Sequence, residues 1–286
     1  MKEFVKKYRK LTVILIVLVL NLFVWYQVYS EDRGEYLKVA FLDVGQGDAT
    51  FIESPDGNQI LIDGGPNKKI LQELGNILPF YDRNIDLIIA THPDQDHIGG
   101  LVDVVKNYEV GAILISGNEC STAVCEEFEK NIKEKGVKEI VAQKGMVINM
   151  GSGAFAQILY PDKDVSKVDS NESSIVTKIV YKDYSFLVTG DAPKNIEQHL
   201  VSIYGNDLKS NVLKIGHHGS KTSTSENFLG YVAPEKAIIS VGAKNRYGHP
   251  TQEVLDMFSN LEIPIERTDQ KGNIIFKTDG EIIEEN

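Results

Sequence analysis

IDLIIATHPDQDHIGG, residues 85–100, joins an apolar run to two histidines and two aspartates that stand within six positions. The apolar run is typical of a buried strand, and a turn that leaves a strand end can point alternate side chains at one centre. Imidazole and carboxylate ligands together suit divalent Zn, Mn or Fe. We therefore expect His92 and Asp94 to bind one ion and Asp96 and His97 a second, because a solvated acidic turn would not need two histidines.

Two other apolar strands end in the same kind of side chain. FLVTG is followed by Asp191, and NVLKIG is followed by His217 and His218. Neighbouring strands of one sheet would bring these ends together. Asp191 is the natural bridge, because a carboxylate can offer one oxygen to each of two ions. His217 is expected to be a ligand and His218 a catalytic group, although the sequence leaves open which of the two binds metal.

Several loop residues are expected to meet the substrate or to assist the reaction. Lys221 could contact a phosphate oxygen or could be a solvated loop lysine. His249 could protonate a leaving oxygen or bind substrate, or it could simply precede a helix that starts after Pro250. Asp96 is expected to orient the attacking water as well as to bind metal, whereas His199 is expected to be a surface residue. Four residues are predicted to orient the ligands without binding the ions: Asp43, Gln46, Asp48 and Asp63.

Residues 36–286 read as one domain, because no Pro-, Gly- or Ser-rich linker and no internal repeat divides them. Short strand-like runs come first, and strands then alternate with helices, which we expect near 68–78, 97–108 and 122–136. The part between the third of these helices and Asp191 is rich in strands. This pattern predicts a mixed α/β class in which sheets pack together and helices lie outside.

Seven segments, in this order, carry a specific resemblance that covers roughly residues 38–278. They are FLDVGQGDAT, ILIDGG, THPDQDHIGG, NESSIV, FLVTGDA, LKIGHHGSKTS and SVGAKNRYGHP. Together they resemble the metallo-β-lactamase superfamily and, within it, the nuclease-like domain of ComEC-type DNA-uptake proteins. The resemblance implies an αββα sandwich of two sheets flanked by helices. It also implies two divalent ions, Zn or Mn, that share a hydroxide and hydrolyse a phosphodiester, with DNA as one candidate substrate.

The chain departs from the superfamily pattern HxHxDH in two respects. Asp94 stands where the second histidine would be, in agreement with the ComEC-like subgroup, and the middle segment offers Asn171 and Ser174 instead of a further histidine. Both changes make the site richer in oxygen, which favours Mn more than an all-nitrogen site does. We expect Asn171, Ser174 and Ser220 to contact substrate.

Residues 11–29 are uncharged and long enough to cross a bilayer as a helix. The basic residues of 1–10 precede this run, and acidic residues of the linker 30–35 follow it. The positive-inside rule then predicts a single-pass anchor with the catalytic domain outside the cytoplasm. The alternative is a cleaved signal peptide, but the exit sequence YQVYS has bulky residues where small ones are usual. ComEC-type proteins carry a multi-span channel that one apolar run cannot build, so DNA uptake is not expected to carry over.

The charge distribution limits how a polyanion could bind. The net charge is −11, and the first ten residues carry +4, so the remainder carries −15. Such a body is not built to coat itself with phosphate backbone, and a polyanionic substrate would have to be attracted locally by metal ions or a few basic groups. Two thiols alone cannot close a zinc site, so Cys120 and Cys125 are either a small disulfide or free thiols.

Three functions compete on this basis. The first is a metal-dependent phosphodiesterase, which the resemblance and the oxygen-rich ligand set favour. The second is a hydrolase of another exported substrate, such as a choline-phosphate ester or a lactam. The third is a metal-binding surface module without catalysis, which the complete ligand set disfavours.

Overall fold

The structure is a computed structural model that describes residues 2–30 and 36–285, with side chains described for 8–26 and 36–285. It forms two compact units, Met1–Glu35 and Tyr36–Asn286. In the first, α1 spans Lys2–Ser30, and its segment Tyr8–Tyr26 is long and apolar enough to cross a membrane. The predicted acidic linker lies almost entirely outside the described residues.

The second unit contains two β-sheets. The first has the strand order β15-β14-β1-β2-β3-β4-β5-β6, and the second has the order β13-β12-β11-β10-β9-β8-β7. The strands of the first sheet are β1 (Leu37–Phe41), β2 (Thr50–Glu53), β3 (Gln59–Ile62), β4 (Asn84–Ala90), β5 (Glu109–Ile115), β6 (Lys138–Val141), β14 (Ile274–Thr278) and β15 (Ile283–Glu285). Those of the second are β7 (Val147–Gly151), β8 (Ala154–Tyr160), β9 (Val176–Tyr181), β10 (Tyr184–Val188), β11 (Val212–Lys214), β12 (Lys236–Ile239) and β13 (Ile265–Arg267).

Each sheet changes from antiparallel to parallel pairing part-way across. Strands β3 to β6 are parallel in the first sheet, and β10 to β13 are parallel in the second. Parallel strands end at the same edge, so the loops that follow β3, β4, β10, β11 and β12 can gather there. This edge is where the candidate site lies.

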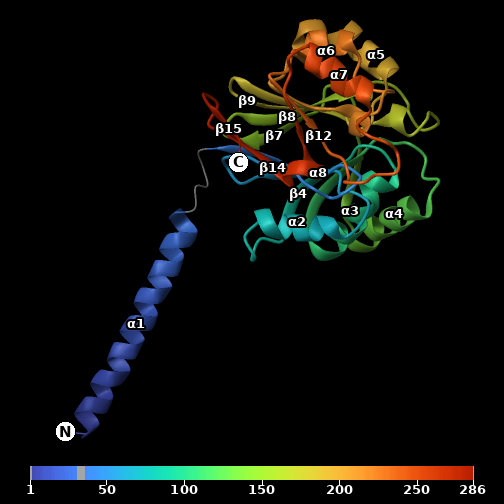
Figure 1. The fold of residues 1–286 in the computed structure, drawn as a ribbon. Coiled ribbons are helices and arrows are strands. Elements are labelled where there is room, and N and C mark those ends of the chain that lie inside the picture. The colour runs from blue at the N-terminus through green and yellow to red at the C-terminus, as the bar shows by residue number, and fades with distance from the viewer. Residues whose placement is uncertain (1, 31–35, 286) are drawn as a thin grey trace. The chain divides into compact units, whose positions relative to one another are not determined.

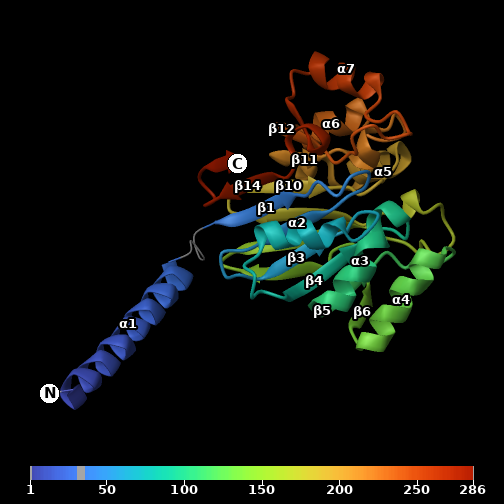
Figure 2. The same ribbon diagram turned by 60° about the horizontal axis from the view of Figure 1, so that its bottom comes forward.

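Helices cover the outer face of each sheet (Figures 1 and 2). The helices are α2 (Lys69–Ile77), α3 (Gln95–Asn107), α4 (Ala123–Lys135), α5 (Lys194–Tyr204), α6 (Glu226–Val232), α7 (Gln252–Asn260) and the short α8 (Thr268–Lys271). One apolar core lies between the sheets, including Phe41, Ile89 and Phe186. Separate cores lie under α2–α4 and under α5–α7. The predicted αββα sandwich is confirmed.

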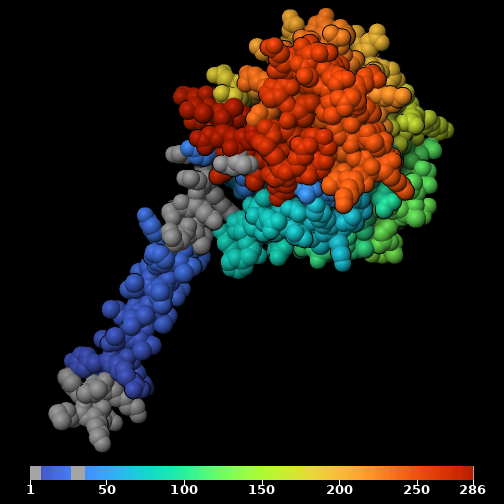
Figure 3. Space-filling model, viewed as in Figure 1, coloured from blue at the N-terminus to red at the C-terminus, as the bar shows by residue number. Residues whose placement is uncertain are grey.

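Local signals explain where the elements begin and end. The helix expected at 122–136 is α4, because the Thr122 side chain accepts a hydrogen bond from the Cys125 amide and Gly136 ends the helix in the left-handed region. The edge strands β7 and β15 escaped prediction, since they are short and partly exposed. Figure 3 shows the early segments, in cyan, meeting the late segments, in orange and red, along one face of the second unit.

Candidate metal centre

The candidate site forms where strand ends of the two sheets meet. Asp63 follows β3 and His92 follows β4 in the first sheet, whereas Asp191 follows β10 and His217 follows β11 in the second. The expectation that these ends belong to neighbouring strands of one sheet holds for β10 and β11, which pair in parallel, but is wrong for β4, which lies in the other sheet. Two edges of a sandwich converge instead, because the apolar faces of both sheets pack against each other and bring the loops together.

The loop after β11 contains two adjacent residues with positive φ angles. Both His217 and His218 lie in the left-handed region, with φ of 49° and 54°. Such a conformation is costly for residues other than glycine and persists only where the surroundings enforce it. Gly100 lets α3 pack against the loop after β3, because a Cβ there would collide with the Gly64 carbonyl. The local fold thus holds two adjacent imidazoles toward one region.

His92 is held as a neutral ring with one nitrogen turned inward. The Thr91 hydroxyl donates to Asp63 Oδ2 at 2.7 Å, so it can only accept from His92 Nδ1 at 3.0 Å. The Nδ1 atom therefore carries the proton, and Nε2 keeps a free lone pair. Burial, with the nearby His97, lowers the pKa of His92 to about 4, which keeps the ring neutral at physiological pH.

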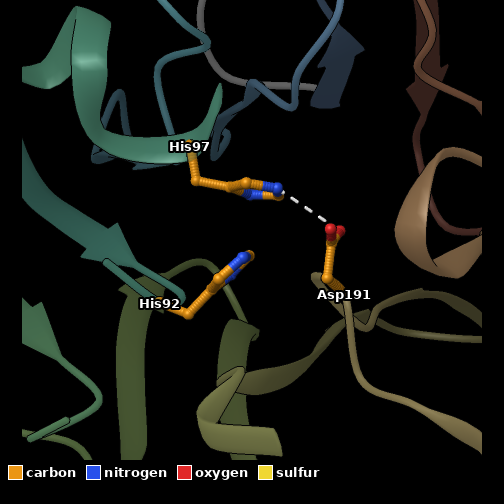
Figure 4. Close-up of side chains that lie close together, drawn as sticks. All are labelled: His92, His97 and Asp191. Atoms are coloured by element: carbon orange, nitrogen blue, oxygen red, sulfur yellow. Dashed lines mark ion pairs between the residues drawn. The ribbon is translucent and has the colours of Figure 1, made fainter. Parts of the chain in front are cut away.

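His97 lies between two carboxylates. Its Nδ1 is 2.8 Å from Asp63 Oδ2, and its Nε2 is 3.3 Å from Asp191 Oδ1. Figure 4 shows His97, from the first turn of α3, converging with His92 and Asp191, which come from two loops. Burial alone would lower the pKa of His97, but Asp191 and Asp63 raise it well above the usual range. An Asp63 partner on Nδ1 is the arrangement that orients a metal-binding imidazole through its other nitrogen.

Asp191 presents each carboxylate oxygen to a different histidine group. Oδ1 faces His97, whereas Oδ2 lies 3.7 Å from His217 Nε2 and 3.8 Å from His218 Nε2. Burial alone would raise its pKa, but His97 and His218 hold the pKa well below the usual range. The carboxylate is therefore ionised, and its two oxygens face different histidine side chains.

The Nδ1 side of His218 contacts one group from each sheet, Ser240 after β12 and Asp48 before β2. Its Nδ1 donates to the Ser240 carbonyl at 2.9 Å and lies 3.1 Å from Asp48 Oδ1. Its Nε2 lies 3.2 Å from Asp96 Oδ2. Burial alone would lower its pKa, but Asp191 and Asp48 raise it to about 10. The fully buried Lys214 makes an ion pair with Asp48 and offsets part of this negative charge.

Asp94 and Asp96 complete the cluster from its more exposed side. Asp94 Oδ2 is 3.7 Å from His92 Nε2, and the Asp94 side chain is 40% exposed. Partial burial raises the pKa of Asp94, whereas the hydrogen bond from His218 lowers that of Asp96 against the effect of its burial. Both carboxylates therefore lie within reach of the same centre as the histidines.

The arrangement fits divalent metal ions. Among the described residues, His92 Nε2, His97 Nε2 and Asp191 Oδ1 are buried without a hydrogen-bond partner, and the three atoms lie within 4.8 Å of one another. Buried polar atoms are rarely left unpaired, since each costs about 1–3 kcal/mol. Further compatible groups are Asp96 with His97 and His218, and Asp48 with Asp191 and His218. A mixture of imidazole and carboxylate suits Zn, Mn or Fe.

Residues 42–243 match the family model of the metallo-beta-lactamase superfamily. The chain belongs to this superfamily. It is 34% identical to ComE operon protein 3 of Bacillus subtilis over 257 residues, which cover 84% of this chain and 33% of that protein. It is 31% identical to competence protein ComA of Neisseria gonorrhoeae, with 91% of this chain and 35% of that protein covered. The chain thus spans about a third of these curated relatives.

Solved metallo-β-lactamase folds resemble the chain in structure. YhfI of Bacillus subtilis aligns with a TM-score of 0.52 and 14% identity, over 80% of this chain and 96% of that one. Tm1679, described as a metal-dependent hydrolase of the β-lactamase superfamily, aligns with a TM-score of 0.52 and 12% identity, over 81% and 95% of the two chains. At such identities the likeness concerns the fold alone.

The four residues predicted to orient the metal ligands of this metallo-β-lactamase fold differ in what they contact. Asp48 and Asp63 contact candidate ligands directly, as described above. Asp43 instead accepts from the Gly45 amide and pairs with Lys69 at 2.9 Å. The Gln46 side chain accepts from the Gly242 amide at 3.1 Å and so holds a late loop against an early one.

The three residues expected to meet substrate, Asn171, Ser174 and Ser220, are all buried or partly buried. Ser174 is fully buried, where its hydroxyl lies 3.4 Å from His92 Nδ1 and accepts from the Asp191 amide at 3.1 Å. A hydroxyl so enclosed lies against the candidate ligand His92 and the Asp191 backbone, where it can position both. Ser220 is buried too and bonds to Thr222. Asn171 Oδ1 is buried without a partner among the described residues.

Two predicted functional side chains lie outside the ligand cluster. Lys221 is exposed on the turn after the histidine pair. The His249 ring centroid is 5.6 Å from that of His217, and burial together with His217 lowers the pKa of His249. His199 lies on α5 with a 40% exposed side chain and bonds to Asp162 at 2.9 Å, away from the cluster.

Sequence reasoning missed Thr91, Lys214 and Ser240. Lys214 had a signal, because it is a single charge inside the apolar run NVLKIG that becomes β11. Ser240 acts through its backbone carbonyl, and because every residue has one, the sequence gives no sign of this role. The alternative left open for the cysteines is decided as well: Cys120 and Cys125 form a disulfide with Cα atoms 5.6 Å apart at the start of α4.

Proposed function

We propose that the chain is a binuclear metal-dependent phosphodiesterase. The observation that carries this proposal is the buried Asp191 carboxylate, which lies beside the unpartnered Nε2 atom of His92 and also contacts His97, His217 and His218. Competence proteins among the relatives make a nucleic-acid phosphodiester the first substrate to test. An oxygen-rich, partly acidic ligand set supports phosphate-ester chemistry over lactam hydrolysis.

We propose that Asp191 joins two ligand groups. His92 and Asp94 would hold one ion with it, and the second ion would be held by Asp96, His97 and His218. Assigning His218 as a ligand reverses the sequence-based roles of the two adjacent histidines. The reason is that the Nδ1 proton of His218 is committed to the Ser240 carbonyl, which leaves Nε2 to face the centre.

The ions would supply Lewis acidity that polarises a phosphoryl oxygen and lowers the pKa of a water. The residues of the chain perform the remaining tasks. Asp96, one-third exposed, can hold the attacking water in line as well as bind metal. His217 and His249 face the open side and can protonate the leaving oxygen. Lys221, exposed on the adjoining turn, can pair with a neighbouring phosphate.

We propose Mn²⁺ as a working metal that supports turnover at least as well as Zn²⁺. Asp94 supplies an oxygen where an imidazole is usual, and Ser174 is turned to His92 rather than to an ion. Raw affinity would still favour Zn, so the test is turnover after metal is stripped and each ion is added back. Asp94→His should shift the preference toward Zn, and an unmoved preference would remove ligand hardness as the selecting factor.

We propose that α1 anchors the catalytic domain in a membrane, with that domain outside the cytoplasm. The side chains of Tyr8–Tyr26 are all exposed and mostly apolar, which an aqueous environment disfavours. Protease added to intact cells should remove the domain and leave a short membrane-bound remnant. A fully protected domain would refute this topology, and release of an intact domain into the medium would indicate a cleaved signal.

The substrate is tested with a panel assayed on the metal-reconstituted protein. Chromogenic phosphodiester, phosphomonoester, choline-phosphate and lactam substrates are each incubated with Zn or Mn, with Asp191→Ala as the catalytically impaired control. We expect phosphodiester turnover to exceed the others and to vanish in the variant. Preferred turnover of another substrate would redirect the assignment, and metal binding without any turnover would identify a non-catalytic module.

A further inference from the structure

The loop between Gly242 and Pro250 displays a group of side chains that the metal centre does not use. Tyr247 is 54% exposed, although it is a large aromatic residue. Lys244 and Arg246 are exposed beside it in the sequence. The Arg246 guanidinium lies 5.1 Å from the centroid of the Tyr247 ring and donates to its hydroxyl at 3.1 Å.

The loop is held in place by one asparagine. Asn245 Oδ1 accepts from the amides of Tyr247 and His249, both at 3.1 Å, and its Nδ2 donates to the Gly242 and His249 carbonyls. Gly242 in turn contacts Gln46, as described above. The backbone that carries Tyr247 is thus tied to the loop that contains Gln46, so the ring projects from a backbone of defined position.

A row of rings connects Tyr247 to the candidate ligands. The Tyr247 ring lies 6.0 Å from that of His249 with an interplanar angle of 24°. The His249 ring lies 5.6 Å from that of His217, whose Nε2 is 3.7 Å from Asp191 Oδ2. The exposed Tyr247 ring is therefore connected to His217 through one intervening ring, that of His249.

Local positive charge accompanies this surface. Lys221, Lys244 and Arg246 are all exposed, and none of them pairs with a carboxylate among the described residues. Because the chain carries a net charge of −11, a polyanion would have to be attracted by local basic groups such as these. Aromatic platforms flanked by basic side chains are how proteins bind single-stranded nucleic acids without reading sequence.

We propose that Tyr247 is a base-stacking subsite for single-stranded nucleic acid, with Arg246 and Lys244 as its phosphate contacts. This proposal rests on the proposed phosphodiesterase function and names its substrate class. A base on the Tyr247 ring would take over the contact that Arg246 now makes, and the guanidinium would be released to pair with a phosphate. The neighbouring phosphodiester would then extend along His249 toward Asp191.

The test measures binding without hydrolysis. Fluorescein-labelled oligothymidylate of twelve nucleotides is titrated with the whole chain in EDTA, and the dissociation constant is read from fluorescence anisotropy. Tyr247→Ala should bind about tenfold more weakly, within the range of one lost base–aromatic stack. Tyr247→Phe should bind as the wild type does. Tyr231→Ala, which removes a partly exposed tyrosine from α6, is the matched control and should leave binding unchanged.

An abasic strand of the same length separates stacking from charge. The wild type should bind it about as weakly as Tyr247→Ala binds oligothymidylate, and Tyr247→Ala should lose nothing further on it. Equal affinity of the wild type and Tyr247→Ala for oligothymidylate would overturn the subsite. The subsite would also be overturned if Tyr247→Ala lost as much affinity for the abasic strand as for oligothymidylate. That result would mean that Tyr247 supports the loop and does not stack on a base. Neither result depends on turnover, so the phosphodiesterase proposal is judged separately.

Discussion

Replacing Asp63 by asparagine should weaken metal binding although it changes neither size nor shape. Asp63 is buried, its Oδ1 accepts from the Thr91 amide at 2.8 Å, and its Oδ2 accepts from the Thr91 hydroxyl and from His97 Nδ1. Asparagine has one acceptor oxygen and one NH₂ group. In either orientation the NH₂ faces at least one donor, which costs about 1–3 kcal/mol in a buried site.

The orientation of the amide decides how the ligand is lost. If the NH₂ faces His97, the ring can accept from it only by moving its own proton to Nε2, the atom that faces Asp191. A protonated Nε2 cannot bind a cation. Loss of such an orienting partner typically lowers metal affinity about 10- to 100-fold, which is about 1.4–2.8 kcal/mol.

The assay is a competitive titration of metal-free protein against a chromogenic chelator. Asp63→Asn should show the 10- to 100-fold loss for at least one of the two ions. Asp43→Asn makes the same chemical change, but Asp43 contacts Gly45 and Lys69 rather than a ligand, so its affinities should stay within twofold of the wild type. The reasoning fails if Asp63→Asn binds as tightly as the wild type, or if Asp43→Asn loses as much.

Three further predictions concern the same cluster. Asp191→Ala should retain its fold by circular dichroism but lose turnover by about 100-fold or more and bind fewer than two ions by elemental analysis; wild-type rates would make Asp191 merely structural. Lys214→Met should lower the free energy of unfolding by about 3–5 kcal/mol, because it leaves the Asp48 carboxylate buried without its partner. Thermal unfolding in EDTA should show this loss, and the double variant Lys214→Met, Asp48→Asn should recover part of it. If the two substitutions instead lower the free energy of unfolding additively, the pairing is contradicted. Metal binding at pH 7 should release protons, because the pKa of His97 is raised well above its usual range and that of His218 to about 10, and only their deprotonated forms bind metal. Metal affinity should therefore rise with pH below these pKa values, by about tenfold per unit for each proton released; calorimetry in two buffers of different ionisation enthalpy measures that number, and a value of zero would contradict the assignment.

Residue pattern predicted much of the architecture because each signal is local. Apolar runs of strand length recur as β4, β8 and β10, and the helix near Thr122 begins and ends with its own capping residues. The candidate ligands could be predicted for the same reason, since residues such as His92 and Asp191 come directly after apolar strands in the sequence. The family resemblance in seven ordered segments is also a property of the sequence, and the comparisons confirm it.

Other features depend on which segments meet in space. That β4 lies in one sheet and β10 in the other is decided by packing of the apolar faces, which no strand sequence specifies by itself. The burial of Ser174, and the contact of His218 with Asp96, follow from that packing.

The sequence by itself thus determined the superfamily, the residue types of the centre and an apolar segment near the amino terminus, because composition and spacing carry this information directly. Only the tertiary structure decided the proton arrangement of the centre. The Thr91 hydroxyl can orient His92 only because Asp63, from another strand, accepts its proton. Likewise, His218 is oriented by a backbone carbonyl at Ser240, a group that every residue possesses and that only the fold can bring within hydrogen-bond distance.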